Sequence, residues 1–197
     1  MVSGKNLIDK FAFISVYNKS KLNFLCKNLK YHKYKFISTG STFKEIRSLG
    51  YKCIEISKIT DFKEILDGRV KTLNPKVYGS ILFKRDNLNH LKQFNDLKFP
   101  QIDIVIVNFY PFNKFIKSND HEKIIEMIDI GGPSLVRAAG KNYKFVTTIS
   151  SISEYSGLIS NLNKNHSKTD LDFRKKVASN AFRTCYNYDN LISNWLS

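Results

Sequence analysis

The sequence predicts an α/β fold, in which a parallel sheet is flanked by helices and followed by a C-terminal helical extension. Short apolar runs, typical of strands buried on both faces, alternate with segments of helical periodicity. Beyond residue 150 the pattern is helical alone. The 197 residues fit one compact unit, and we expect an α/β domain at 1–150 with a helical extension at 151–197 packed on it.

The first half of the chain predicts repeated strand and helix units. Residues 11–16 form an apolar run suited to a buried strand, and residues 21–31 carry apolar side chains at helical spacing. Further strands are expected at 35–39 and 52–56. Thr42 and Glu45 match a capping box, which places a helix start directly after the glycine turn at residue 40.

The second half continues this alternation. The expected elements are strands at 77–83, 102–107 and 145–149, and helices at 121–128 and from residue 131. Gly79 interrupts the first of these strands, whereas 102–107 is the strongest strand pattern in the chain. Pro133 is expected at the favoured first position of its helix. Ser151 and Glu154 form a second capping box, which opens the helical C-terminal part.

Composition excludes several classes of protein. The apolar fraction is 42%, with no run long enough to cross a bilayer and no leader pattern at residues 1–10, so we expect a soluble chain and no membrane partner. The cysteines and histidines are isolated in the sequence, at Cys26, Cys53, Cys185, His32, His90, His121 and His166. No two of them have the spacing of a disulfide framework or metal site. A cytoplasmic setting and no metal are expected.

The net charge of +15 suggests a nucleic-acid partner, but its distribution does not support one. Lysines occur in almost every segment, without an arginine-rich stripe or tail. Most aromatic residues lie in apolar segments, where they are expected in the core rather than stacked on bases. We therefore expect no nucleic-acid binding, although the positive field would favour an anionic small substrate.

Residues 67–75, with the sequence DGRVKTLNP, are suited to holding an anion. Gly68 lets the backbone turn, while Arg69, Lys71 and Thr72 supply donors for a phosphate or a developing oxyanion. The alternative interpretation is a solvated basic turn, because short motifs often match by chance.

Polar residues follow three of the predicted strands, and the carboxyl ends of parallel strands meet at one edge of a sheet. They are Ser15, Lys19, Thr39, Gly40, Ser41, Thr42, Asn108 and Tyr110. The turn at 39–42 leads into a helix N-terminus, where backbone N–H groups and the helix dipole favour a phosphate. The sequence therefore predicts a ligand site at this edge.

A second group of candidates surrounds the helix that starts near residue 131. Asp129 stands beside a helix N-terminus whose N–H groups can form an oxyanion hole, and Arg137 and Lys141 are four residues apart. As an alternative, Asp129 caps the helix and Lys141 closes its far end. Together with Lys71, Asp129 and Lys141 supply the acid and base groups that a dehydration needs.

Five sequence blocks occur in an order that resembles the inosine monophosphate (IMP) cyclohydrolase domain. They are SVYNK at 15–19, STGST at 38–42, ILDGRVKTL at 65–73, VNFYPF at 107–112, and IDIGGPS at 128–134 continued by AGKN at 139–142. The resemblance covers about residues 11–196. That domain is usually the N-terminal half of a bifunctional purine-biosynthesis enzyme, and its fold is a methylglyoxal-synthase-like α/β domain.

The resemblance implies a homodimer that closes 5-formamidoimidazole-4-carboxamide ribotide (FAICAR) to IMP and releases water, without a cofactor. Because no transformylase half follows residue 197, we expect no transformylase activity from this chain, which is either a stand-alone cyclohydrolase or one half of a reduced or divided enzyme. Any formylation would then need a separate transformylase chain as a partner. The implied catalytic residues are Lys71, Tyr110, Asp129 and Lys141. The implied substrate-binding residues are Ser15, Lys19, Thr39, Gly40, Ser41, Thr42, Arg69, Thr72, Asn108, Ile130 and Gly131.

The chain departs from the family pattern at a few positions. Ser41 stands where glycine is common, Asn74 and Tyr78 where histidine is, and Gly140 where alanine is. Two other functions stay open. A methylglyoxal synthase needs a catalytic aspartate and histidine, and no histidine here follows a predicted strand. A nucleotide-sensing regulatory domain would keep the phosphate loop but has no need for the four catalytic residues.

Overall fold

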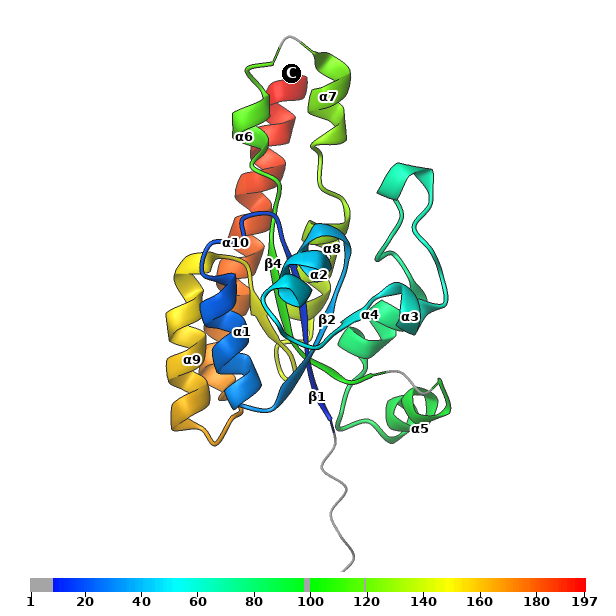
Figure 1. Cartoon of the computed structure of the whole chain (residues 1–197), viewed down its shortest axis with the longest axis vertical. Helices are drawn as coiled ribbons and strands as arrows, with labels where there is room; N and C mark the ends of the chain where they lie inside the picture. Colours follow the sequence, from blue (N-terminus) through cyan, green and yellow to red (C-terminus); the bar gives the residue numbers. More distant parts are fainter. Residues whose placement is uncertain (1–8, 98–99, 119) are drawn as a thin grey trace, which may run out of the picture.

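The computed structural model describes residues 9–97, 100–118 and 120–197. Five parallel strands form one sheet in the order β3-β2-β1-β4-β5 (Figure 1). The strands are β1 Lys10–Val16, β2 Tyr34–Ser38, β3 Cys53–Glu55, β4 Ile102–Asn108 and β5 Thr147–Ile149. The predicted α/β class with a parallel sheet and a helical C-terminal part is confirmed.

Helices follow the strands and cover both faces of the sheet (Figure 1). The shorter ones are α2 Gly40–Ser48, α3 Ser57–Thr60, η1 Leu66–Gly68, α4 Pro75–Leu82, α6 Phe112–Phe115, α7 His121–Glu126 and η2 Ile152–Glu154. The longer ones are α1 Leu22–Tyr31, α5 Leu88–Leu97, α8 Gly131–Lys141, α9 Tyr155–Lys164 and α10 Leu171–Leu196. Within the described residues, no helix combines the length and apolar character needed to span a membrane.

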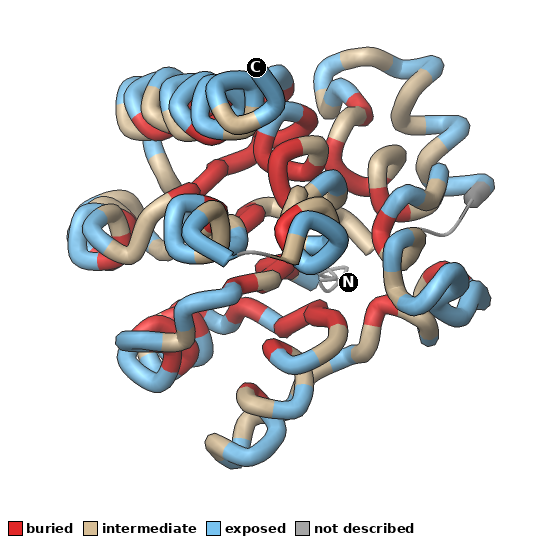
Figure 2. Tube along the Cα trace, turned by 90° about the horizontal axis from the view of Figure 1, so that it is seen from above, coloured by how far each residue is buried: buried red, intermediate tan, exposed pale blue. Residues whose placement is uncertain are grey.

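Strand β1 separates two clusters of buried apolar side chains, because successive side chains of a strand point to opposite faces. Ala12 and Ile14 pack with α1 and α9 on one face, while Phe13 packs with α4 and α8 on the other. Helix α10 contributes Val177 to the first cluster and Cys185 to the second. Figure 2 shows buried positions concentrated between the exposed outer sides of the helices. The C-terminal helices therefore share the core of the α/β unit.

The strand predicted at 77–83 is wrong, because these residues lie in α4. The side chain of Asn74 caps this helix by accepting a hydrogen bond from the N–H of Lys76 at 2.9 Å, and Pro75 occupies its first position. Val77 and Ile81 are both buried and lie one helical turn apart. The helix start signal and this spacing outweigh the β propensity of the individual residues.

Two predicted helix starts also differ from the structure. Helix α2 begins at Gly40, so Thr42 lies inside its first turn rather than at a capping position. The hydroxyl of Thr42 instead accepts from the N–H of Val16 and donates to the carbonyl of Val16, both at 3.0 Å. Pro133 is the third residue of α8, where its missing N–H still costs no intrahelical bond. The capping box of Ser151 and Glu154 is confirmed.

Candidate active site

A cavity of about 550 Å³ lies at the carboxyl edge of the sheet. Its walls come from the ends of β1 and β4, the start of α2, the arm formed by residues 61–74, the end of α7 and the start of α8 (Figure 1). Except for Lys19 and Lys141, every predicted site residue lines it. These are Ser15, Thr39, Gly40, Ser41, Thr42, Arg69, Lys71, Thr72, Asn108, Tyr110, Asp129, Ile130 and Gly131. The structure thus brings separate segments of sequence to one place.

The arm folds back on itself through backbone of left-handed conformation. Leu66, Asp67 and Gly68 have φ angles of 54°, 53° and 90°, and Ile65 pairs with Val70 across the turn. Glycine is the residue that adopts such a conformation without steric cost, which explains its place in this motif. The turn directs the donors that follow it toward the cavity.

Lys71 joins the arm to the first turn of α2. Its Nζ atom lies 3.4 Å from the position that a Cβ on Gly40 would take. It also forms an ion pair with Oε2 of Glu64 at 2.6 Å, and its side chain is 29% exposed. A cation and the N-terminus of α2 therefore face the same part of the cavity, which suits an anionic group of a ligand.

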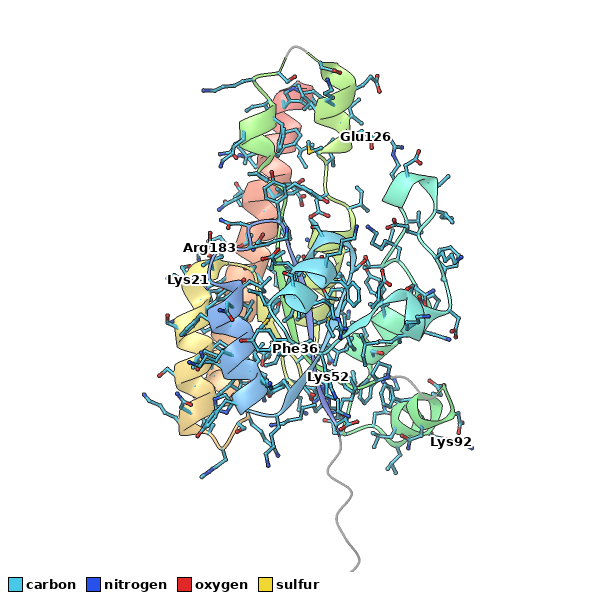
Figure 3. All side chains as sticks on the ribbon, in the orientation of Figure 1. Lys21, Phe36, Lys52, Lys92, Glu126 and Arg183 are labelled. Atoms are coloured by element: carbon cyan, nitrogen blue, oxygen red, sulfur yellow. The ribbon has the colours of Figure 1, made fainter. Side chains whose placement is uncertain are left out.

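Arg69 contacts the opposite wall of the cavity, where its guanidinium pairs with the carboxylate of Glu126 at the end of α7. Figure 3 shows Glu126 between α7 and the arm. The pairing raises the pKa of Arg69 and lowers that of Glu126, in each case mainly through the side-chain hydrogen bond. Sequence analysis missed Glu64 and Glu126, because neither lies in a pattern that indicates an ion pair with a residue of the arm.

Asp129 lies half-buried directly before α8. Its Oδ1 atom accepts the N–H of Gly132 at 2.8 Å. Burial raises the pKa of this carboxyl group above its ordinary value, against the opposing effect of backbone hydrogen bonds from Gly132 and Tyr110. A Cβ on Gly132 would lie 2.4 Å from Asp129 Oδ2, and one on Gly131 would lie 2.9 Å from Thr72 Oγ1. Glycine at both positions permits these close approaches.

A second cavity of about 650 Å³ adjoins the first and shares Tyr17 and Asn108 with it. Lys19 lines this second cavity and not the first. The rings of Tyr17 and Tyr110 meet edge to face, with centroids 5.2 Å apart. The side chain of Asn108 is bonded to the backbone of Asn18, accepting at 2.8 Å and donating at 3.0 Å. Asn108 therefore fixes the loop that follows β1.

Lys141 lies apart from the other predicted catalytic residues. It ends α8 and is exposed, whereas Asp129 and Gly131 stand at the start of that helix. Gly131 and Lys141 are ten positions apart along the α-helix, a rise of about 15 Å. Within one chain, Lys141 therefore lies outside the residues that line the cavity.

The four residues that depart from the family pattern lie within helices or, for Asn74, at a helix start. Asn74 caps α4, and the hydroxyl of Tyr78 bonds Ser134 Oγ at 2.5 Å near the start of α8. Gly140 packs against Phe182, whose Cε2 atom would lie 3.1 Å from an added Cβ. Ser41 is an exposed residue in the first turn of α2.

Among the described residues, no cluster of three or more histidine, cysteine, aspartate or glutamate side chains is suited to a metal ion.

Comparison with known protein families matches residues 21–134 to the MGS-like domain. The chain belongs to the MGS-like domain family. Residues 139–197 match the AICARFT/IMPCHase bienzyme family, so the MGS-like part and the segment that contains the end of α8 and the C-terminal helices are recognised separately. The two matches meet between residues 134 and 139, before residue 150. The domain division at residue 150 that the sequence suggests stays a prediction.

Curated relatives of this MGS-like chain include the bifunctional purine biosynthesis protein PurH of Clostridioides difficile (strain 630), 44% identical over 96% of this chain and 37% of that protein. PurH of Clostridium kluyveri is 46% identical over 94% of this chain and 37% of its own length. The chain thus spans 37% of these relatives. The crystal structure of ForH aligns with a TM-score of 0.87 at 26% identity, covering 95% of this chain and 96% of that one.

Proposed function

We propose that the chain is an IMP cyclohydrolase, which closes the second purine ring of FAICAR to form inosine monophosphate and water. The observation that carries this proposal is the convergence of Lys71, Tyr110 and Asp129 on one cavity beside the start of α2, which is suited to an anion. The bifunctional purine biosynthesis proteins that match the chain support the same reaction.

The ribose phosphate of the substrate would bind at the first turn of α2. Backbone N–H groups at 40–42 and the helix dipole favour a phosphate there, and Arg69 adds a guanidinium. The hydroxyl of Thr42 is already bonded to β1, so this residue would contribute its N–H rather than its side chain. Binding would require the phosphate to replace Glu126 as the partner of Arg69.

Ring closure begins when the carboxamide nitrogen attacks the formyl carbon. Asp129 would accept the proton that this nitrogen loses. Lys71, once it turns from Glu64 and the start of α2, would donate a proton to the formyl oxygen, giving a tetrahedral carbinolamine. The donors at the start of α8, near Ile130 and Gly131, would stabilise negative charge on that oxygen. Since both reacting groups belong to one substrate, orientation in the cavity lowers the barrier further.

Dehydration completes the ring. The formamide nitrogen loses its proton, the carbon–nitrogen double bond forms, and the hydroxyl departs as water after it receives a proton. Lys71, neutral after the first step, would take the formamide proton and, with Tyr110 at the same cavity, pass it to the departing hydroxyl. The proton held by Asp129 then returns to Lys71, so both groups recover their starting charge. The ring closure and loss of water need no external oxidant, reductant or co-substrate.

We assign Lys141 a role only where a second copy of the chain brings it to the cavity. The resemblance implies that Lys141 is catalytic and that the protein is a homodimer, but the helix geometry keeps this lysine away from the cavity of its own chain. Catalysis in trans reconciles these two points. The homodimer, a cytoplasmic setting and a separate transformylase chain stay predictions.

The direct test incubates the purified protein with FAICAR and follows the absorbance of the product. We expect formation of IMP well above the spontaneous rate, and a return to nearly that rate in Asp129→Asn. Asp172→Asn, at an exposed position of α10, is the matched control and is expected to keep full activity. The unformylated ribotide with a formyl-folate donor is expected to give no product.

An absence of product above the spontaneous rate would contradict the proposal. If the protein then still bound the nucleotide, the nucleotide-sensing alternative would be supported, and triose phosphate converted to methylglyoxal would support the remaining one. No feature of the described residues favours either of these two functions over the cyclohydrolase.

A further inference from the structure

Tyr188 of α10 clamps the turn that carries Asp129, although the two residues lie far apart in sequence. Its hydroxyl accepts the N–H of Asp129 at 2.7 Å and donates to the carbonyl of Met127 at 3.1 Å. The residue is only 6% exposed. One hydroxyl therefore satisfies a donor and an acceptor of the segment that leads into α8.

The ring of Tyr188 is itself held in place. Its centroid lies 5.1 Å from that of Phe109, which follows β4, and 6.4 Å from that of Phe112 in α6. One turn earlier on α10, Cys185 is fully buried in the cluster that also contains α8 residues. Figure 1 shows α10 passing beside α8 and reaching α6 and α7. The clamp thus rests on a rigidly packed helix.

We propose that Tyr188 is a positioning residue for Asp129, fixing the direction of its carboxylate for the proton transfer of ring closure. The inference rests on the proposed function for its chemistry and on the hydrogen bonds for its geometry. Tyr188 anchors the backbone of Asp129, and Gly132 anchors its carboxylate through Oδ1. With both ends of the residue held, little rotation is left to it, and catalytic groups need this kind of restraint.

Removing the Tyr188 hydroxyl is expected to change the pKa of Asp129 in one direction. Without the clamp, the turn moves more freely and the carboxylate gains water, so burial raises its pKa less. The titratable groups that act on Tyr188 are Asp129 itself, Asp189 on α10 and Tyr110 after β4. Tyr188→Phe leaves all three in place. The pKa of Asp129 is therefore expected to fall toward the ordinary carboxyl value.

The experiment compares Tyr188→Phe with the unaltered protein and with Tyr186→Phe, an exposed tyrosine two residues away on the same helix. NMR titration of 13C-labelled aspartate carboxyls measures the pKa of Asp129, assigned through Asp129→Asn. We expect a lower pKa in Tyr188→Phe only. Its kcat for FAICAR is expected to fall on the order of tenfold with KM nearly unchanged, because the phosphate end of the cavity is untouched.

A Tyr188→Phe protein with the unaltered pKa of Asp129 and unaltered kcat would overturn the inference. Should that variant not fold, amide hydrogen exchange in the unaltered protein decides instead, and an Asp129 N–H that exchanges as fast as an exposed loop would overturn it. If the pKa shifts but the unaltered protein does not cyclise FAICAR, the proposed function fails and the positioning of Asp129 by Tyr188 stands.

Discussion

The two ends of α8 carry residues that the sequence groups together, yet they meet different surroundings. At the start, Asp129 bonds the N–H of Gly132 inside the cavity. At the other end, Lys141 is exposed, and Asn142 donates to the carbonyls of Ile81 at 2.6 Å and Phe83 at 3.1 Å. The start of the helix serves the candidate active site, whereas the end ties α8 to α4.

This difference shows what a helix does to a sequence motif. Residues that are close in sequence are separated by the rise of the helix, while Lys71 and Asp129, far apart in sequence, line one cavity because their loops share the carboxyl edge of the sheet. The start of α8 also carries the positive end of the helix dipole, and Asp129 caps it by accepting the N–H of Gly132. The end of the helix carries the negative end of the dipole and lies outside the cavity.

The largest effect is expected at the lysine that faces the start of α2. Lys71→Met removes the cation beside the proposed formyl oxygen, and kcat is expected to fall about 10²–10³-fold. Lys63→Met, at an exposed position of the same arm, is the control and should change kcat little. Steady-state kinetics with FAICAR measures both. Equal rates for the two variants would show that the arm supplies general charge rather than a specific donor.

A pair of glycine substitutions compares the ends of α8 directly. Gly132→Ala places a methyl group where Asp129 Oδ2 now lies, so the carboxylate must move, and kcat is expected to fall on the order of 10²-fold. Gly140→Ala meets only the ring of Phe182, a side chain that is 41% exposed and can shift outward, and is expected to keep kcat within about twofold because this contact lies away from the cavity. Comparable losses in both variants would contradict the functional difference between the two ends.

Mixing variants tests whether Lys141 acts on a second copy. Lys141→Ala is expected to lower kcat at least on the order of tenfold, as loss of a proton-transfer group does. Asp129→Asn is expected to be inactive because it lacks the proposed proton acceptor. Mixing the two proteins should restore activity, because a mixed dimer contains one cavity in which both groups are intact. Sedimentation confirms the dimer. Full activity of Lys141→Ala alone, or no recovery on mixing, would remove the proposed role in trans.

The smallest effect is expected at Glu126. Glu126→Gln frees Arg69 for the substrate phosphate, and KM is expected to fall about twofold to fivefold, the size expected for an exposed ion pair. Asp172→Asn, at an exposed position of α10, provides the control, because Glu122 on the same helix as Glu126 also acts on Arg69. An increase in KM would show that Glu126 holds Arg69 in its binding position rather than competing with the ligand.

Most strands could be predicted because buried parallel strands are continuous apolar runs, as in β4. Local β propensity was misleading at α4, where the cap supplied by Asn74 decides the structure. Most of the cavity residues could be predicted from strand ends and glycine turns, but Glu126 could not, because no local pattern links it to Arg69. The contact of Tyr188 with Asp129 could not, because no pattern near either residue indicates a hydrogen bond between segments so distant in sequence.

A crystal structure of the protein with bound IMP tests the account most directly. It should show the phosphate at the first turn of α2 with Arg69 turned toward it, and the purine ring against Asp129 and the start of α8. A nucleotide bound instead in the adjoining cavity, with its phosphate beside Lys19 and Lys114, would contradict it.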